Sequence, residues 1–217
     1  SGLDSQIVGE PQILGQVKDA FTLALETNTT GTVLNNLFQT AFHVGKRVRN
    51  ETEIGTGAVS ISSAAVELAN KIFSDLSKRT VLLIGAGETG ELTARHLQAK
   101  NVKTLYITNR TFQKASDLAE SLDGYPLPYD SFTEKIAEVD IVISATDSPD
   151  YTVDADSVRQ LMPRRQNRPL FFIDIAVPRD IDPRLNKLDN VFVNYIDDLN
   201  TIVQKNVDLR KDEIPAA

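Results

Sequence analysis

The 217-residue sequence contains no cysteine, no tryptophan, one methionine and two histidines. Without cysteine, these residues can form no disulfide, no thiolate metal site and no cysteine nucleophile. No apolar run approaches the roughly 18 residues that a membrane-spanning helix needs, so we expect no membrane span. Basic residues number 23 against 30 acidic ones, and the net charge of −7 argues against a surface devoted to binding nucleic acid.

The composition that remains is ordinary for a globular protein, with 41% hydrophobic and 24% charged residues. At about 100–200 residues per domain, this length suggests one full domain and part of another. Because the chain opens with Ser1 rather than methionine, we expect it to be a piece of a longer protein.

Apolar periodicity divides the chain into a helical first third and a remainder in which strands and helices alternate. Such alternation is typical of βαβ units and a parallel sheet. The expected helices are 9–25, 34–48, 61–76, 88–99, 112–122, 156–162 and one that opens at 196. The expected strands are 80–84, 102–108, 125–127, 139–144, 169–175 and 191–195, and 50–57 is an expected linker. We therefore predict an α/β fold, a Rossmann-type doubly wound parallel sheet of order 3-2-1-4-5-6, preceded by helices of a second domain.

A glycine-rich sequence, Gly85-Ala86-Gly87-Glu88-Thr89-Gly90, follows the strand predicted at 80–84 and opens the next helix. In a GxGxxG loop the first glycine allows a tight turn, the second admits a pyrophosphate, and the third allows close packing of helix and strand. The helix N-terminus also offers free N–H groups to phosphates. Both flanks fit the motif, so we interpret residues 85–90 as a dinucleotide-binding loop rather than a connecting turn.

The end of the second strand distinguishes NAD from NADP. NAD-binding sites place a carboxylate there, about 20 residues beyond the loop, to bind the ribose 2′-hydroxyl. Here the position reads Asn109-Arg110-Thr111, which has no carboxylate and has a guanidinium that can pair with a 2′-phosphate. The sequence thus favours NADPH as the cofactor, although Arg110 could instead cap a surface turn. The loops 144–149 and 174–180 also follow strands, and each is either a wall at the nicotinamide end or an ordinary polar turn.

Several segments, taken in order, resemble the glutamyl-tRNA reductase family over nearly the whole chain. They are 1–5, 9–18, 37–41, 45–52, 54–55, 59–62, 85–89, 109–111, 174–181 and 197–199. The segment Gly9–Lys18 is highly specific for this family, whereas Asn109-Arg110-Thr111 is also similar to shikimate dehydrogenases.

The resemblance implies an NADPH-dependent reduction of glutamyl-tRNA(Glu) to glutamate-1-semialdehyde, the first step of tetrapyrrole (porphyrin) biosynthesis through 5-aminolevulinate. It implies a cysteine thioester, formed by a cysteine that lies before Ser1 together with its associated histidine. We therefore expect this chain to bind NADPH without turning over. A cytoplasmic location is implied as well, or the plastid stroma for a plant source.

By the same resemblance, the contacts to the glutamyl substrate fall on Ser5, Glu10, Pro11, Gln12 and Gln16. Gln12 and Gln16 are four residues apart and would share one helix face, whereas Ser5 and Glu10 could also be helix-capping residues. No metal site is expected, and His43 and His96 both fall within amphipathic helices.

The resemblance implies three parts. Residues 1–52 would end a catalytic domain, 53–195 would form the NADP(H)-binding domain, and 196–217 would begin a spinal helix towards a dimerisation domain of the parent homodimer. The basic cluster Lys46, Arg47 and Arg49 is either a tRNA or glutamate contact or a solvated helix face. Two alternatives remain: another NADP-dependent dehydrogenase of shikimate dehydrogenase type, or a non-catalytic NADP-binding module.

Overall fold

The computed structural model describes residues 11–52, 60–212 and 214, and it divides the chain into two compact units. One unit is Ser60–Thr201, and the other is Ser1–Val59 together with Ile202–Ala217. Helix α8 (Ile196–Asp212) begins in the first of these units and continues beyond its boundary. In the described residues, no helix is both long enough and apolar enough to cross a membrane.

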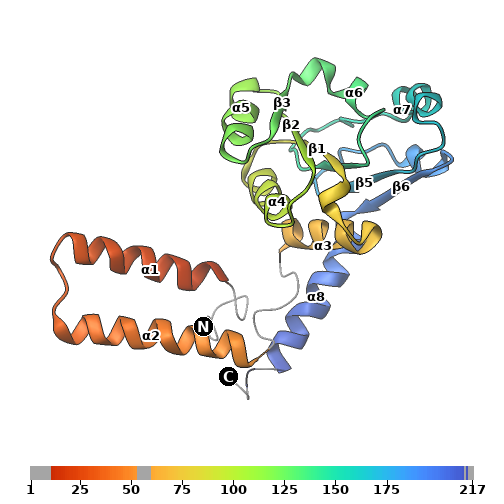
Figure 1. Cartoon of the computed structure of the whole chain (residues 1–217). Helices are drawn as coiled ribbons and strands as arrows, with labels where there is room; N and C mark the ends of the chain where they lie inside the picture. Colours follow the sequence, from red (N-terminus) through yellow and green to blue (C-terminus); the bar gives the residue numbers. More distant parts are fainter. Residues whose placement is uncertain (1–10, 53–59, 213, 215–217) are drawn as a thin grey trace. The chain divides into compact units, whose positions relative to one another are not determined.

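The smaller unit contains a helical hairpin of α1 (Pro11–Glu26) and α2 (Thr32–Glu51), which lie side by side (Figure 1). Three aromatic rings from the two helices meet between them: the centroid of Phe21 lies 4.9 Å from that of Phe38 and 5.7 Å from that of Phe42. The predicted helix at 34–48 is too short, because α2 continues to Glu51, which pairs with Arg47 one turn earlier. The expected linker 50–57 therefore overlaps the end of α2, and its residues 53–57 lie outside the described residues.

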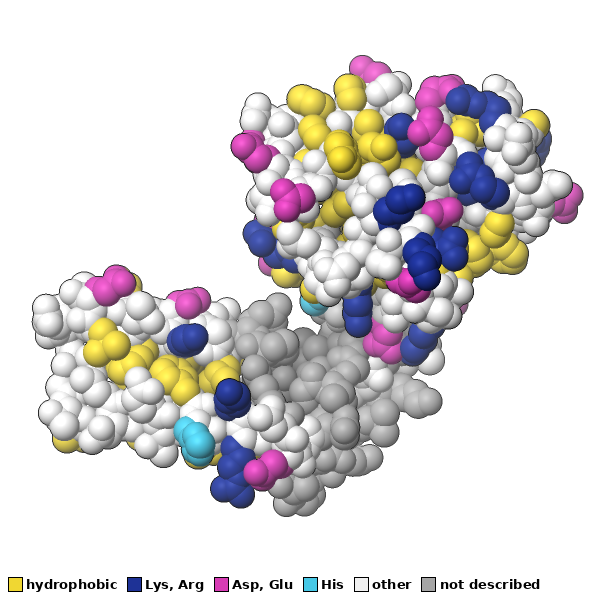
Figure 2. Space-filling view, viewed as in Figure 1, with side chains coloured by type: hydrophobic (Ala, Val, Ile, Leu, Met, Phe, Trp, Pro, Cys, Tyr) yellow, Lys and Arg dark blue, Asp and Glu magenta, His cyan; other side chains and the backbone are white. Residues whose placement is uncertain are grey.

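Hydrophobic side chains also lie on the outside of this hairpin, as Figure 2 shows along α1 and α2. The large apolar residues of the hairpin that remain exposed are Leu23, Leu25, Val33, Leu34, Leu37 and Val44. The two helices thus bury only a narrow seam against each other.

The larger unit is built on a six-stranded parallel sheet of order β3-β2-β1-β4-β5-β6, which confirms the predicted topology. The strands are β1 (Thr80–Ile84), β2 (Thr104–Thr108), β3 (Tyr125–Leu127), β4 (Ile141–Ser144), β5 (Leu170–Asp174) and β6 (Val191–Tyr195). All four residues of β4 and four of the five in β1 are buried, as expected for central strands covered on both faces.

Helices cover the sheet on both sides (Figure 1). On one side, α6 (Phe132–Lys135) and α7 (Ala155–Leu161) pack with Leu82, Val142 and Phe172 in the main hydrophobic cluster. Elsewhere α3 (Ile61–Phe73) packs against α4 (Glu88–Ala99), and α5 (Phe112–Ser121) contacts β2 and β3. The core is therefore made in two layers, one on each face.

Helix α3 begins with a capping box, in which the Ser60 hydroxyl accepts from the Ser63 N–H and the Ser63 hydroxyl accepts from the Ser60 N–H. The predicted end at Leu76 is wrong. The helix stops at Phe73 because Ser74 is left-handed (φ 60°), and Asp75 caps a separate short turn, Leu76–Lys78, by accepting from the Ser77 N–H. Leu76 is nevertheless buried, so it is apolar because it belongs to the core and not because it continues the helix.

The largest fully buried side chain in the described part of the chain is Arg165. Its guanidinium donates to four main-chain carbonyls: Val139 (2.6 Å), Ile136 (2.7 Å), Pro169 (2.7 Å) and Arg168 (3.3 Å). Burial lowers the pKa of Arg165 to about 10, so the group stays charged at neutral pH. It ties the segment before β4 to the segment before β5.

We expect Arg165→Met to lower the free energy of unfolding by about 3 kcal/mol or more, because buried carbonyls would lose their donor. Chemical denaturation measures this loss. The matched control is Arg164→Met, next in the chain, whose exposed pair with Glu134 should contribute less than about 1 kcal/mol. Equal losses for the two variants would contradict the structural role of Arg165.

Candidate functional site

A cleft of about 470 Å³ lies at the carboxyl ends of β1, β2 and β4. This is the edge of an open parallel sheet where ligands bind, at the point where the strand order reverses. The loops that follow these three strands supply most of the wall. The lining residues are Gly85, Gly87, Glu88, Thr89, Asn109, Arg110, Thr111, Lys114, Tyr129, Ala145, Thr146 and Asp147.

The glycine loop is shaped by close backbone approaches. Gly85 has a φ of +105°, and a Cβ there would lie 2.5 Å from the Ala145 carbonyl oxygen. A Cβ at Gly90 would lie 2.1 Å from the Gly85 carbonyl oxygen, so α4 can start against β1 only with glycine at that position. Gly87, the N-cap of α4, has no atom within 4 Å of its hypothetical Cβ and faces open space. The loop thus leaves room beside the first turn of α4.

Seven of the nine residues that we predicted to bind the cofactor line this cleft: Gly85, Gly87, Glu88, Thr89, Asn109, Arg110 and Thr111. The other two support it. The Ala86 N–H donates to the Asn109 side-chain oxygen at 3.1 Å, which joins the loops after β1 and β2, and Gly90 is buried in the helix–strand contact.

Two further lining residues, Lys114 and Tyr129, were not predicted, and a third, Asp147, lies in the loop 144–149, which the sequence already singled out. Lys114 lies in the first turn of α5, one turn after Thr111, and helix geometry alone could have placed it beside Arg110. Tyr129 follows β3 and reaches the cleft only through the sheet order. Asp147 accepts a hydrogen bond from Arg110 at 3.0 Å, across 37 residues of sequence.

A second hollow of about 310 Å³ shares Thr89, Ala145 and Thr146 with the first. Its other lining residues are apolar: Ile61, Ile175, Val177 and Ile196. Both loops that the sequence analysis singled out, 144–149 and 174–180, contribute to it. The site therefore has a polar compartment beside Arg110 and a largely apolar one beyond Thr146.

A buried carboxylate, that of Asp180, fastens these two loops together. It accepts from the Ser144 hydroxyl (2.6 Å), from the Thr146 hydroxyl (2.6 Å) and N–H (3.0 Å), and from the Thr152 hydroxyl (3.1 Å). Asp180 is completely buried. Charge-assisted bonds of this kind are stronger than neutral ones, so Thr146 is held by both its side chain and its backbone.

A second buried carboxylate, at the end of β5, holds the loop that carries Asp180. Asp174 accepts from the N–H groups of Ala176 (3.1 Å), Asp180 (3.0 Å) and Ile181 (3.0 Å). Burial raises the pKa of Asp174 to about 6, and the nearby charge of Asp180 acts in the same direction, against the three N–H donors. Asp174 therefore changes protonation close to neutral pH.

The residues predicted to contact the glutamyl substrate are described only in part. Ser5 and Glu10 lie outside the described residues, Pro11 and Gln12 begin α1 but their side chains are not described, and Gln16 is exposed on α1. Their role remains a prediction.

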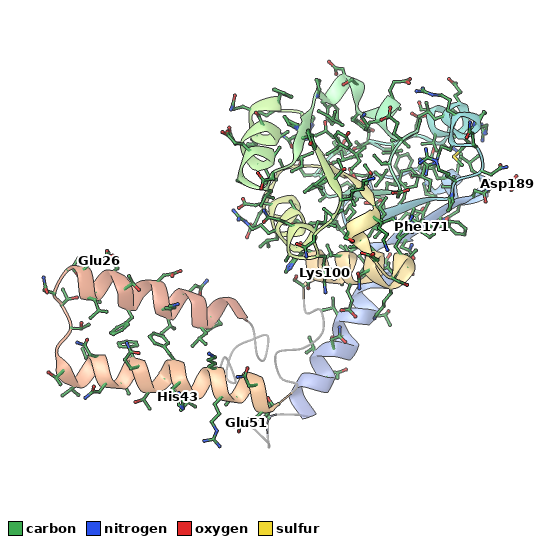
Figure 3. The ribbon with its side chains drawn as sticks, in the orientation of Figure 1. Glu26, His43, Glu51, Lys100, Phe171 and Asp189 are labelled. Carbon is green, nitrogen blue, oxygen red and sulfur yellow. The ribbon has the colours of Figure 1, made fainter. Side chains whose placement is uncertain are left out.

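Among the described side chains, neither histidine, nor Lys46 or Arg47, lines the cleft or the second hollow. His43 is exposed on the side of α2 away from α1 (Figure 3), and burial lowers the pKa of the half-buried His96. Arg47 pairs with Glu51 and Lys46 is exposed, which is consistent with a solvated helix face, while the side chain of Arg49 is not described. Among the described residues, no three His, Cys, Asp or Glu side chains are placed to hold a metal ion.

The parallel sheet, its strand order and the glycine-lined cleft at the carboxyl edge define a Rossmann-type dinucleotide-binding protein of the NAD(P) class. Family models agree with this assignment and divide the chain. Residues 67–202 match the family described as shikimate / quinate 5-dehydrogenase, and residues 1–52 match the family described as glutamyl-tRNAGlu reductase, N-terminal domain.

Similar curated proteins match the chain from end to end. It is 48% identical to the glutamyl-tRNA reductase of Thermodesulfovibrio yellowstonii and 51% identical to that of Magnetococcus marinus, in each case over 100% of this chain and 51% of the relative. The chain thus spans about half the length of the curated relatives it matches.

A solved structure, the glutamyl-tRNA reductase of Methanopyrus kandleri, is 41% identical, with a TM-score of 0.83 over 99% of this chain and 54% of that one. The nucleotide-binding domain of the Thermoplasma volcanium enzyme shares the fold at 24% identity, with a TM-score of 0.54 over 72% of this chain. The chain belongs to the glutamyl-tRNA reductase family. The family model described as shikimate / quinate 5-dehydrogenase covers residues 67–202, which include the whole sheet.

Asp174 predicts a specific pH dependence of stability. Its pKa of about 6 in the folded protein exceeds the 3.8 of an exposed aspartate, so between about pH 4 and 6 the folded state binds more protons than the unfolded state. The stability that this residue contributes therefore falls as pH rises through that window. Denaturation of wild type and Asp174→Asn should show a difference in unfolding free energy that declines by about 2–3 kcal/mol from pH 4 to pH 7.

The exposed Asp189 (Figure 3) provides the control, because Asp189→Asn removes the same charge without burial. A wild-type to Asp174→Asn difference that stays constant with pH, or that grows as pH rises, would contradict the assignment.

Proposed function

We propose that the cleft binds NADPH in preference to NADH. The observation that carries this proposal is the pair of cations, Arg110 and Lys114, lining the cleft where β2 ends, at a position where NAD-binding sites place a carboxylate. A guanidinium and an ammonium together suit the two negative charges of a 2′-phosphate.

The remaining parts of a dinucleotide site fit the same cleft. The N–H groups of Glu88, Thr89 and Gly90 precede the first hydrogen bond within α4, which runs from the Glu91 N–H to the Gly87 carbonyl, so they are available to a pyrophosphate. The open space at Gly87 is where that group would approach the backbone. The apolar hollow beyond Thr146 suits the nicotinamide ring.

We infer that the parent protein reduces glutamyl-tRNA(Glu) to glutamate-1-semialdehyde, the first step towards 5-aminolevulinate and tetrapyrroles. Membership of the family supports this reaction. NADPH would supply the hydride, while Thr146 and the apolar hollow would orient its reactive end and limit the access of water. The 217 residues hold no cysteine, so the thiol of a thioester mechanism would have to come from another part of the protein.

We further propose a role for each of three segments of the chain. Residues 1–52 would complete a catalytic domain in which Ser5, Glu10, Pro11, Gln12 and Gln16 contact the glutamyl group, as the family match over 1–52 supports. Residues 53–195 would hold NADPH, and 196–217 would begin a spinal helix towards the dimerisation domain of a homodimer. A tRNA substrate would place the protein where aminoacylation occurs, which is the cytoplasm in bacteria.

The direct test of cofactor choice is Arg110→Asp. Loss of a charged hydrogen-bonding partner costs about 1.5–3 kcal/mol, so the Kd for NADPH should rise about 10- to 100-fold while that for NADH changes little. Isothermal titration calorimetry with both cofactors measures the two effects. Arg95→Asp is the control, since Arg95 carries the same charge in an exposed pair with Glu91 on α4, outside the cleft lining. Equal weakening of both cofactors by Arg110→Asp would refute the proposed 2′-phosphate contact.

Gly87→Ala tests the place of the pyrophosphate. The backbone at Gly87 has a φ of −81°, which alanine adopts without strain, and its Cβ would meet no protein atom. We therefore expect a melting temperature within about 2 °C of wild type but NADPH binding at least about 10-fold weaker, because the new methyl group would occupy the ligand's space. Gly31→Ala is matched, since Gly31 is also an extended N-cap glycine facing open space. If the two variants bind NADPH equally well, the pyrophosphate lies elsewhere.

A further inference from the structure

One ion pair in the cleft involves the residue expected to bind the 2′-phosphate. The Arg110 Nη2 atom lies 3.0 Å from the Asp147 Oδ1 atom, and both side chains line the same cleft. Arg110 follows β2 and Asp147 follows β4, so the contact spans the cleft between the two loops that flank the glycine loop. The side chains are 59% and 91% exposed, which leaves both accessible to a ligand.

The backbone on both sides of Asp147 is held in place although its side chain is exposed. Thr146 is fixed by Asp180 through its hydroxyl (2.6 Å) and its N–H (3.0 Å). The Ser148 N–H in turn donates to the Thr146 hydroxyl at 3.1 Å. Asp147 therefore projects from a loop whose backbone is hydrogen-bonded on both sides, which keeps its carboxylate beside the cleft.

This carboxylate opposes the ligand that Arg110 and Lys114 would attract. A phosphate that takes the Arg110 guanidinium must displace Asp147, and the displaced carboxylate stays nearby as a negative charge. NADH has a hydroxyl in place of the 2′-phosphate, so it neither competes for Arg110 nor suffers this repulsion. The two cofactors differ only at that group, which makes Asp147 a determinant of the ratio of their affinities.

We propose that Asp147 is a specificity-determining residue that competes with the 2′-phosphate for Arg110 and so limits both the affinity for NADPH and the preference over NADH. The inference rests on the proposed function, NADPH binding in this cleft. Its consequence is that the wild-type protein binds NADPH more weakly than its two cations would allow, and that removing the charge of Asp147 tightens binding.

The experiment compares wild type, Asp147→Asn and Asp150→Asn by calorimetry with NADPH and NADH in buffer of fixed ionic strength. Asp150 is the matched control, because it is an exposed aspartate three residues further along the chain. It lines neither the cleft nor the second hollow. Asparagine keeps the shape of the side chain and removes only the charge. For Asp147→Asn we expect the Kd for NADPH to fall about three- to tenfold, as the loss of an exposed competing pair and its repulsion implies, with the Kd for NADH unchanged.

Adenosine 2′-phosphate serves as a second probe, since it carries the 2′-phosphate without the pyrophosphate or the nicotinamide. Its Kd should fall by a similar factor in Asp147→Asn and stay constant in Asp150→Asn. If Asp147→Asn binds NADPH as Asp150→Asn does, or more weakly because Asp147 orients Arg110 for the phosphate, the inference is overturned while the proposed function stands. If wild type and both variants fail to bind NADPH, the proposed function and the inference fail together.

Discussion

The buried carboxylate of Asp180 is the constraint on which the shape of the cleft depends. It has no contact with solvent, and it accepts hydrogen bonds from Ser144 at the end of β4, from Thr146 in the following loop and from Thr152 beyond it. A buried charge is tolerable only when its oxygen atoms are satisfied, so the loops that satisfy Asp180 are not free to take other positions. The positions of these loops therefore follow from the hydrogen bonds that the buried Asp180 carboxylate requires.

The remaining contacts of the site extend from this point. The backbone N–H of Asp180 donates to the carboxylate of Asp174 at the end of β5. This bond helps to hold the Asp180 side chain in place. On the other side, the backbone of Ala145 lies so close to Gly85 that no Cβ could stand between them, and Gly85 in turn closes against Gly90 at the start of α4. Hydrogen bonds and close backbone contacts therefore join the loops after β1, β4 and β5, an arrangement that suits a preorganised binding site.

The features that could be predicted from the sequence are those set by residues close together in the chain. The glycine loop, the strands and their order follow from short patterns, and Arg110 was recognised because the segment Asn109-Arg110-Thr111 directly follows a strand. Contacts between distant segments could not be foreseen in the same way. The pairing of Arg110 with Asp147 spans 37 residues, and the bonds from Ser144 to Asp180 span 36, so they exist only once the sheet is assembled. The end of α3 could not be predicted either. Ser74 ends this helix through a left-handed backbone conformation, which the spacing of apolar residues does not indicate.

The measurement that tests the central claim most directly is a crystal structure of this chain with NADPH bound. We expect the pyrophosphate at the first turn of α4 beside Gly87 and the nicotinamide next to Thr146. We expect the 2′-phosphate in contact with Arg110 and Lys114, with Arg110 released from Asp147. A well-ordered NADPH whose 2′-phosphate points into solvent, while Arg110 keeps its bond to Asp147, would contradict it.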